Sequence, residues 1–269
     1  MKKILITGDK GYIGQHLRKM LEGQYDVGGI DVKYGKDIFN LDYSTPQEYD
    51  TVVHLAAFVK VNDSVNFPYA YYHNNIEGTQ RVLSGVKYDN FIFASTGAAE
   101  NPVSPYGLSK RCAEDIVTSH CKRYDKSYTT FRFYNVVGSD GFEPTNPDGL
   151  MLNLMKSEAS GQFNVYGYDY DTPDGTAIRD YVHVNEVCTA IKKAIEKPAN
   201  GLENLGHGEG TSVLDMVEAF KLVNSIDFKV NLCDRRPGDL PVSVLKNVSP
   251  YMEKQYTIEE LLEITHDNI

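Results

Sequence analysis

The sequence predicts an α/β fold in which a doubly wound parallel sheet carries helices on both faces. The chain begins with an apolar strand, a glycine-rich turn and a helical pattern, all within its first 21 residues. Further apolar runs then alternate with helical patterns up to about residue 138, as in a parallel sheet whose strands are joined by helices. A length of 269 residues is enough for one large α/β domain or for two lobes.

Composition and charge narrow the class of protein. The formal net charge of −10 argues against general nucleic-acid binding, which needs a basic surface. No run of about 18 apolar residues occurs, so neither a membrane span nor a membrane partner is expected. The N-terminal apolar run is too short for a signal peptide. The four cysteines lack metal-like spacing, so we expect no metal site and a reducing, cytoplasmic location.

The first element in the chain predicts a dinucleotide site. The strand Lys3–Thr7 runs into the turn Gly8-Asp9-Lys10-Gly11-Tyr12-Ile13-Gly14, and a helical pattern follows over Gln15–Leu21. Glycines allow the backbone to approach a pyrophosphate, and a helix N-terminus supplies N–H donors and a positive dipole. The alternative is a tight strand-to-helix turn that binds no ligand.

The second strand, Asp26–Ile30, ends in an acidic residue, Asp31. A carboxylate at this place can accept hydrogen bonds from an adenosine ribose and would repel a 2′-phosphate, which favours NAD over NADP. The stretch from Asp31 to Thr51 is short, so we expect a reduced third strand and helix there.

Two further buried strands are predicted over Thr51–Ala57 and Phe91–Thr96, with a long helical pattern over 62–86 between them. The first strand closes on small residues, against which a cofactor could lie flat. The hydroxyls of Ser95 and Thr96 stand at the carboxyl end of the second, where open α/β sheets bind ligands.

The stretch that follows carries the pattern Tyr-x-x-x-Lys at Tyr106 and Lys110, on a helix expected to reach about Tyr124. Residues four apart lie on one face of a helix, so the phenol and the ammonium are expected side by side. A nearby cation favours the phenolate, and we expect Lys110 to lower the pKa of Tyr106 toward the range of a general base. Thr96 is the hydroxyl expected beside Tyr106. The alternative is a chance match in a chain with 19 tyrosines.

The order of these motifs resembles the extended branch of the short-chain dehydrogenase/reductase superfamily. The match includes Thr7-Gly8-x-x-Gly11-Tyr12-Ile13-Gly14 and Asn74-Asn75-x-x-Gly78-Thr79. The resemblance implies a Rossmann NAD-binding domain over 1–135 with a returning segment near 180–206, and a nucleotide-sugar lobe over 136–179 and 207–269. It implies that the cofactor contacts Gly8, Gly11, Tyr12, Ile13, Gly14, Asp31, Asp37, Ile38, Ala56, Asn75, Ser95, Tyr106, Lys110 and Tyr134.

The second half of the chain resembles the UDP-glucose 4-epimerases within that superfamily. The runs 163–170, 174–184 and 235–241 carry this resemblance. Guanidinium groups bind phosphate bidentately and keep their charge, which suits arginines beside a diphosphate. The resemblance implies substrate contacts from Thr96, Tyr106, Asn135, Asn164, Tyr166, Arg179, Arg236, Asp239 and Ser243. Ser243 matches the position that gates an N-acetyl group, and its small side chain should admit N-acetylhexosamines.

The resemblance implies NAD-dependent epimerisation at C4 of a UDP-hexose, UDP-galactose or UDP-glucose, through a 4-keto intermediate. Tyr106 would take the proton of the 4-hydroxyl while NAD takes the hydride, Thr96 would orient or relay the proton, and Lys110 would hold the nicotinamide ribose. A homodimer through a four-helix interface is also implied. Three alternatives remain: a 4,6-dehydratase, a 4-keto reductase and a non-catalytic NAD-binding sensor.

Two departures from the family pattern concern the sugar pocket. Only Gly97 to Pro105 separate Thr96 from Tyr106, whereas the family has a longer segment with its own tyrosine there. Gly149 stands where relatives often carry a phosphate-binding asparagine. The sugar pocket is therefore expected to lack part of one wall.

Overall fold

The computed structural model describes residues 1–138, 141–142, 146 and 149–267. Its largest sheet has six parallel strands in the order β2-β1-β3-β4-β5-β9, with the chain reversing its direction of winding at β1. The strands are β1 (Lys3–Thr7), β2 (Asp26–Ile30), β3 (Thr51–His54), β4 (Asn90–Thr96), β5 (Ser127–Phe133) and β9 (Gly201–Leu205). The predicted doubly wound parallel sheet is confirmed.

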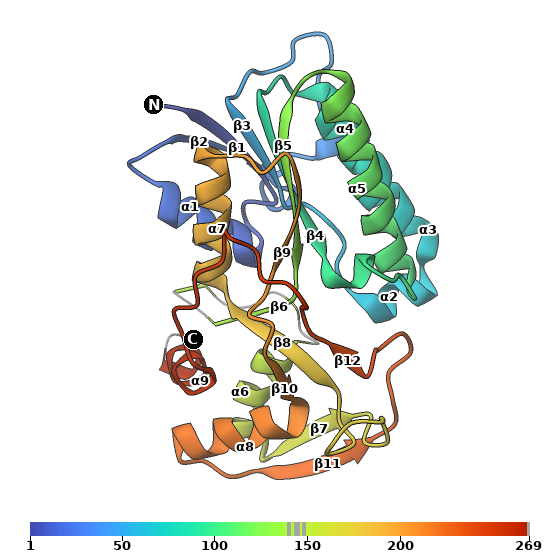
Figure 1. The fold of residues 1–269 in the computed structure, drawn as a ribbon, viewed down its shortest axis with the longest axis vertical. Helices are drawn as coiled ribbons and strands as arrows, with labels where there is room; N and C mark the ends of the chain where they lie inside the picture. The colour runs from blue at the N-terminus through green and yellow to red at the C-terminus, as the bar shows by residue number, and fades with distance from the viewer. Residues whose placement is uncertain (139–140, 143–145, 147–148, 268–269) are drawn as a thin grey trace.

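Helices cover both faces of this sheet (Figure 1). On one face lie α1 (Tyr12–Leu21) and α7 (Val184–Glu196); on the other lie α2 (Val61–Asn66), α3 (Pro68–Tyr71), a π-helical turn (Tyr72–Glu77), α4 (Gly78–Gly85) and α5 (Pro105–Arg123). Side chains alternate along β1, so Ile4 and Ile6 pack in the core under α1 and α7, whereas Leu5 packs in the core under α4 and α5. The sheet is therefore buried on both faces, as its apolar strands predict.

Several predicted elements differ in detail. The stretch from Asp31 to Thr51 contains two 3-10 turns, Val32–Tyr34 and Ile38–Asn40, and no strand. The strand predicted over 51–57 ends at His54. The helical pattern over 62–86 is interrupted at Phe67, because Pro68 begins a new helix and cannot continue the previous one.

The remaining elements form a smaller lobe at the carboxyl end of the large sheet (Figure 1). A four-stranded sheet has β8 at its centre, and β7 pairs with β11 in a second, two-stranded sheet. The predicted end of this lobe, residues 268 and 269, lies outside the described residues. Its elements are β6 (Asn135–Val137), α6 (Leu150–Ser160), β7 (Gln162–Tyr166), β8 (Ile178–His183), β10 (Gly210–Ser212), α8 (Val213–Asn224), β11 (Lys229–Cys233), β12 (Val242–Ser243) and α9 (Ile258–Asp267).

The smaller lobe has a hydrophobic core of its own, in which Leu154 of α6, Phe163 of β7 and Phe220 of α8 are buried together. Its strand β8 continues directly into α7, which packs on the large sheet. The chain therefore passes between the two sheets at the end of β8. Within the described part of the chain, no helix has the length and apolar character needed to cross a bilayer.

A buried ion pair joins α5 to β5. The Arg132 guanidinium donates two hydrogen bonds to the Glu114 carboxylate, at 2.8 and 2.7 Å, and both side chains are at most 8% exposed. The Ser95 hydroxyl donates a third, at 2.6 Å. Removing one member of such a pair leaves an uncompensated buried charge.

We therefore expect Glu114→Ala to reduce the free energy of unfolding by about 3–5 kcal/mol, as measured by urea denaturation. Asp115→Ala is the matched control, because Asp115 neighbours Glu114 on α5 but is 75% exposed and pairs only loosely with Arg111. Its effect should stay within about 0.5 kcal/mol. Equal effects of the two substitutions would contradict the assigned importance of the buried pair.

Candidate active site

The first turn of α5 lies against the carboxyl end of β4. Ser104 caps this helix by accepting a hydrogen bond from the Gly107 N–H at 3.2 Å, and Pro105 occupies its first position. A Cβ on Gly107 would lie 2.6 Å from the Ala98 carbonyl oxygen, so the absence of a side chain allows this approach. The structure thereby brings the Tyr106 phenol close to the Thr96 hydroxyl, as predicted, and that hydroxyl affects the pKa of the phenol.

The pKa of Tyr106 differs from the expectation. Burial raises it to about 12, and the hydrogen bond with Thr96 offsets only part of this rise. Lys110 is also buried, and burial lowers its pKa to about 7, against a smaller opposing effect of Glu114. Its ammonium lies 4.2 Å from the centre of the Phe93 ring and acts electrostatically on His54. In the polypeptide without cofactor, Lys110 does not offset the rise in the pKa of Tyr106, and the expectation that it lowers this pKa beside bound NAD remains a prediction.

His54, the last residue of β3, is buried. Its ring nitrogens lie 2.6 Å from the Thr7 hydroxyl and 3.1 Å from the Thr79 hydroxyl. Burial lowers its pKa to about 3, with a further contribution from Lys110. A histidine that stays neutral and is held by two hydroxyls serves as a structural link between β1, β3 and α4.

The glycine turn has the geometry of a phosphate cradle. Gly8 has a φ of +76°, and a Cβ there would lie 2.8 Å from the Ala56 nitrogen. A Cβ on Gly14 would lie 2.2 Å from the Gly8 carbonyl oxygen. Gly11 is the N-cap of α1, so no cap side chain covers the N–H groups of residues Tyr12 and Ile13. These residues fit the pyrophosphate of a dinucleotide.

Asp31 caps the turn after β2, at the edge next to the glycine turn. Its carboxylate accepts hydrogen bonds from the Lys33 N–H at 2.9 Å and the Lys10 N–H at 3.0 Å. Asp37 caps the next turn by accepting from the Phe39 N–H at 3.0 Å, and Ile38 beside it is buried. Asp31, Asp37 and Ile38 therefore lie in two consecutive turns that follow β2.

The sequence reasoning missed Asp9, which lies inside the glycine turn and is 1% exposed. Its carboxylate accepts from the Arg18 guanidinium at 2.8 Å and from the Tyr34 hydroxyl. A Cβ on Gly29 would lie 2.2 Å from Asp9 Oδ2, so β2 needs a glycine at this point. The sequence signal that could have predicted this ion pair is an acidic residue between two glycines, followed by an arginine on the next helix.

Other predicted cofactor residues mainly hold neighbouring segments together. Asn75 exchanges hydrogen bonds with the backbone of Phe58 at 2.8 and 3.0 Å and donates to the Ser109 hydroxyl at 2.9 Å. The Tyr12 hydroxyl donates to the Gly138 carbonyl oxygen. The Ser95 hydroxyl donates its hydrogen bond to the buried carboxylate of Glu114. Their predicted contacts with the cofactor remain predictions.

Tyr134 and Asn135 lie where the chain leaves β5 for the smaller lobe. A Cβ on Gly97 would lie 3.1 Å from the Tyr134 ring, so the ring covers the turn after β4. The Asn135 side chain donates to the Asp180 carbonyl oxygen at 3.4 Å. Both residues therefore face the junction between the two lobes.

The structure gathers the predicted nucleotide-binding residues on one side of the smaller lobe. Arg179 pairs in register with Ser243, and the Arg236 guanidinium lies 5.0 Å from the centre of the Tyr166 ring. Arg236 also forms an ion pair with Asp239 at 3.1 Å. Asn164 lies on the same exposed face of β7 as Tyr166, where β7 pairs with β11, and it accepts a hydrogen bond from Asn231 at 3.1 Å.

The loop between β11 and β12 reaches the first turn of α5. Gly238, with a φ of +83°, lies so that a Cβ would be 3.2 Å from Val61 and 3.8 Å from Ser104, the residue that caps α5. This loop carries Arg236 and Asp239. The predicted nucleotide residues and the predicted catalytic residues therefore meet at one place.

A cavity of about 380 Å³ lies beside this junction. Tyr71, one of its lining residues, contacts the Tyr106 ring edge-on with 6.3 Å between the ring centres. The volume of the cavity falls within the range of small-molecule sites. The lining residues are Ala57, Phe58, Val59, Lys60, Asp63, Phe67, Ala70 and Tyr71.

Comparison with known proteins identifies the family. A model of the NAD dependent epimerase/dehydratase family matches residues 4–206. The chain belongs to this family. A UDP-glucose 4-epimerase of Haemophilus influenzae is 34% identical over 88% of this chain and 87% of its own length. The probable UDP-arabinose 4-epimerase 3 of Arabidopsis thaliana is 31% identical over 97% of this chain and 79% of its own.

Solved structures of the epimerase/dehydratase family agree. The UDP-glucose 4-epimerase of Bifidobacterium longum, in complex with NAD⁺ and UDP, superposes with a TM-score of 0.85 at 25% identity, over 99% of this chain and 97% of that one. The predicted family, fold class and NAD cofactor are confirmed. The alignment with the Arabidopsis relative spans 332 positions against 269 residues in this chain, so that relative carries insertions that this chain lacks.

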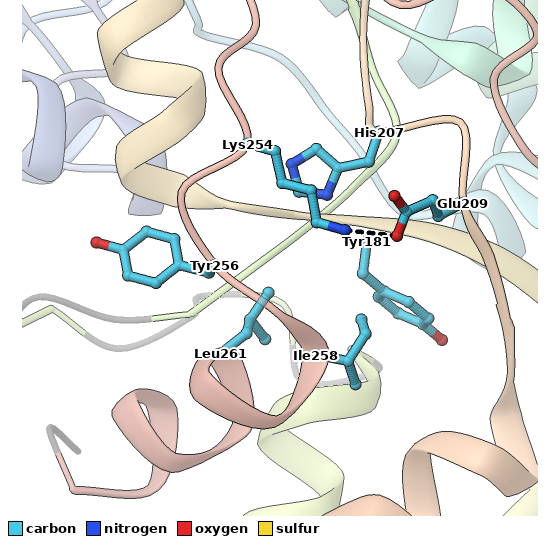
Figure 2. Close-up of a pocket in the computed structure, with 7 residues that line it drawn as sticks. All are labelled: Tyr181, His207, Glu209, Lys254, Tyr256, Ile258 and Leu261. Carbon is cyan, nitrogen blue, oxygen red and sulfur yellow. Dashed lines mark hydrogen bonds and ion pairs between the residues drawn. The ribbon is translucent and has the colours of Figure 1, made fainter.

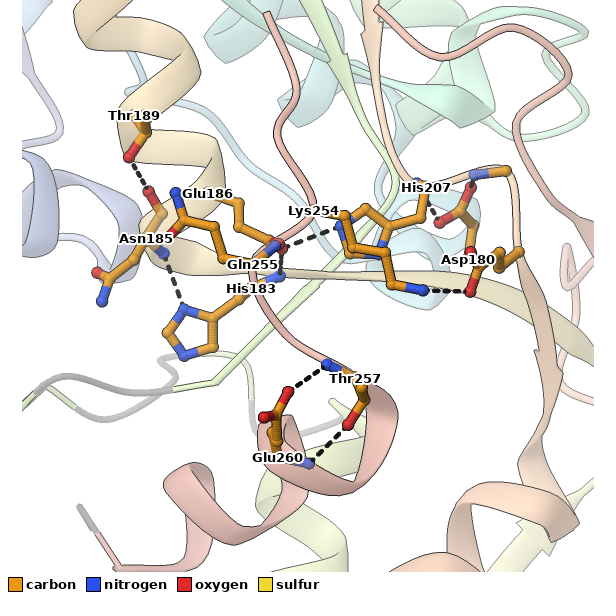
Figure 3. Close-up of polar contacts among 12 residues, drawn as sticks. Asp180, His183, Asn185, Glu186, Thr189, His207, Lys254, Gln255, Thr257 and Glu260 are labelled. Carbon is orange, nitrogen blue, oxygen red and sulfur yellow. Dashed lines mark hydrogen bonds and ion pairs between the residues drawn. The ribbon is translucent and has the colours of Figure 1, made fainter.

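A buried polar cluster fixes the smaller lobe of this epimerase/dehydratase to α7 and to the C-terminal segment (Figure 3). The Glu186 carboxylate accepts hydrogen bonds from the backbone N–H of His183 at 2.8 Å and of Gln255 at 2.6 Å, and it lies 3.1 Å from the His207 ring. The Asp180 carboxylate accepts three backbone N–H groups, from His207, Gly208 and Leu245. Each carboxylate thus joins segments distant in the sequence.

A small pocket lies beside this cluster, bridged by the ion pair of Lys254 with Glu209 at 2.6 Å (Figure 2). Its volume of about 10 Å³ leaves room for no more than a water molecule. The pocket is therefore not a substrate site. Among the described residues, no three His, Cys, Asp or Glu side chains are arranged to hold a metal ion.

The lowered pKa of Lys110 makes stability depend on pH. An unfolded lysine titrates near ~10.4, whereas burial brings folded Lys110 to about 7. Between pH 7 and 8.5 the unfolded chain therefore binds a proton that folded Lys110 has lost, and the free energy of unfolding rises with pH, by about 1–2 kcal/mol. Urea denaturation of NAD-free protein at both pH values measures this rise.

Lys110→Met should lack this rise, because its side chain does not titrate. Lys122→Met is the control, since Lys122 lies on the same helix but is exposed, and it should keep the wild-type dependence. A wild-type profile that matches that of Lys110→Met would show that Lys110 keeps its ordinary pKa.

Proposed function

We propose that the protein epimerises C4 of a UDP-hexose, UDP-galactose or UDP-glucose, through a 4-keto intermediate. One observation carries this proposal: the loop with Arg236 and Asp239 reaches the helix turn that holds Tyr106, so a diphosphate on the arginine would leave its sugar near the phenol. The relatives named as UDP-glucose and UDP-arabinose 4-epimerases support the reaction type. The hexose is proposed to occupy the cavity beside Tyr71.

In this proposal the side chains of the polypeptide handle the proton. Tyr106 removes the proton of the 4-hydroxyl, and the Thr96 hydroxyl, which lies close to the phenol, orients this proton. Bound NAD supplies the hydride acceptor and a positive charge that opposes the raised pKa of Tyr106. Lys110 is proposed to hold the nicotinamide ribose rather than to charge the phenol.

The remaining site assignments are proposals of the same kind. We propose that the large sheet with α1 and Asp31 holds the cofactor and that the smaller lobe holds the nucleotide. The Rossmann part is taken as residues 1–135 with a returning segment near 180–206, and the nucleotide lobe as 136–179 and 207–269. The four cysteines are free, which supports a reducing, cytoplasmic location.

We also propose a homodimer. Exposed apolar side chains gather on α2, α3 and α5, on the face of the molecule away from the sheet. They include Val65 of α2, which is 45% exposed, Tyr69 of α3, which is 83% exposed, and Leu108 of α5, which is 43% exposed. An apolar face of this kind marks an interaction site, and pairing with a second copy would cover it.

The alternatives are less well supported. A 4,6-dehydratase carries Asp-Glu directly after the threonine, whereas Gly97 and Ala98 follow Thr96 in a 3-10 turn. A 4-keto reductase that uses NADPH is disfavoured by Asp31 at the ribose edge. A non-catalytic sensor would have no need for the buried Tyr106 and Lys110 that this chain retains.

The decisive test is proton NMR of UDP-galactose incubated with purified protein and no added cofactor. The proposal expects conversion to UDP-glucose, and at least about a hundredfold slower conversion by Tyr106→Phe, which lacks the acid–base group. Tyr124→Phe is the control, because Tyr124 ends the same helix and is 61% exposed. An absence of conversion by the wild type, even with NAD added, would rule out this substrate.

The small side chain at Ser243 should set the tolerance for N-acetyl groups. Ser243 is half-buried on β12, in register with Arg179. We expect Ser243→Tyr to lose at least about tenfold in kcat/KM for UDP-N-acetylgalactosamine, an effect of about 1.4 kcal/mol, while its activity on UDP-galactose stays within threefold, or about 0.7 kcal/mol. Ser243→Ala should keep both activities. Full N-acetyl activity in Ser243→Tyr would refute the gate.

A further inference from the structure

Tyr170 is held rigidly in the loop between β7 and β8. It is 6% exposed, and its backbone N–H donates to the Gly175 carbonyl oxygen at 2.9 Å. Its ring lies across Gly167, where a Cβ would come within 2.2 Å of Tyr170 Cε2. The loop is therefore folded around this ring, and the direction of the phenol is fixed.

The Tyr170 hydroxyl is buried without a hydrogen-bond partner anywhere in the described part of the chain. Its neighbours Tyr166 and Tyr168 differ, because they are 40% and 48% exposed and reach water. A buried polar group without a partner is costly and uncommon in native proteins. A group that is not part of the polypeptide could supply the missing partner.

The charges around this hydroxyl indicate what that group is. The guanidinium groups of Arg179, Arg235 and Arg236 and the carboxylate of Asp239 all act electrostatically on the phenol. Arg236 is paired with Asp239 at 3.1 Å. Arg235 is paired with Asp169 at 2.6 Å and stacks on the Tyr170 ring, 4.2 Å from its centre.

Arg179 differs from the other two arginines. Its guanidinium donates to the Ile178 carbonyl oxygen at 3.0 Å, and it has no carboxylate partner among the described residues. The environment therefore holds an excess positive charge beside a hydroxyl donor. An anionic oxygen, such as that of a phosphate, satisfies both.

We propose that the Tyr170 hydroxyl donates a hydrogen bond to the diphosphate of the bound nucleotide, beside Arg179. Arg235 stacks on the ring and is paired with Asp169, so the hydroxyl that the ligand-free chain buries without a partner is left for the phosphate of the bound nucleotide. This inference rests on the proposed function for the identity of the ligand. Tyr170 is thereby a binding residue for the phosphate and takes no part in the proton transfer at C4.

Tyr170→Phe tests this directly, because it removes only the hydroxyl. Calorimetric titration should show UDP binding weakened by about tenfold to a hundredfold, the range for a hydrogen bond to a charged group. Binding of uridine, which lacks phosphate, should be unchanged. The thermal midpoint of the ligand-free variant should not fall, because the hydroxyl has no partner to lose there. Tyr168→Phe, in the same loop, should match the wild type in all three measurements.

Two results for Tyr170→Phe would overturn the proposal. One is an affinity for UDP equal to that of the wild type. The other is a lowered thermal midpoint together with equal losses of UDP and uridine affinity, which would make Tyr170 a packing residue only. A wild type that binds UDP but lacks 4-epimerase activity would overturn the proposed function and leave this inference standing. A wild type that binds no UDP would overturn both.

Discussion

The placement of the first turn of α5 against the end of β4 is the constraint on which the site depends. Ser104 caps this turn, and the missing side chain of Gly107 lets it approach the Ala98 carbonyl. Tyr106 and Lys110 are buried as a result, and burial is also what moves their pKa values in opposite directions. Without cofactor, Tyr106 is therefore a protonated phenol and Lys110 is about half protonated near pH 7, so the proposed mechanism relies on the positive charge of the cofactor to make the phenol a base.

Motifs that act through neighbouring residues were predictable from the sequence. The strand, glycine turn and helix at the N-terminus, and the cap and helix around Tyr106, are all set by local chemistry. The parallel sheet could be predicted because buried strands alternate with helical patterns along the sequence. The predicted contacts to cofactor and sugar remain predictions.

Interactions between distant residues were not predictable in the same way. Glu114 and Arg132 carry no local signal that they form a buried pair, and neither do Asp9 and Tyr34. The direction of the Lys110 ammonium toward Phe93 and His54 depends on the packing of α5 on the sheet. Helical spacing placed Lys110 on the same face as Tyr106, but it could not show how deeply burial would alter both groups.

The carboxylate of Glu186 joins the end of β8, the ring of His207 and the C-terminal segment at Gln255. Burial raises its pKa, but the hydrogen bonds from His207 and from the two backbone N–H groups outweigh this and hold the pKa below its usual range. The carboxylate therefore stays charged, and the three segments remain tied near neutral pH. The buried carboxylate therefore opposes separation of these three segments. With these segments tied, the proposed substrate would enter past the loops and side chains at the junction of the lobes, among them the short segment from Gly97 to Pro105.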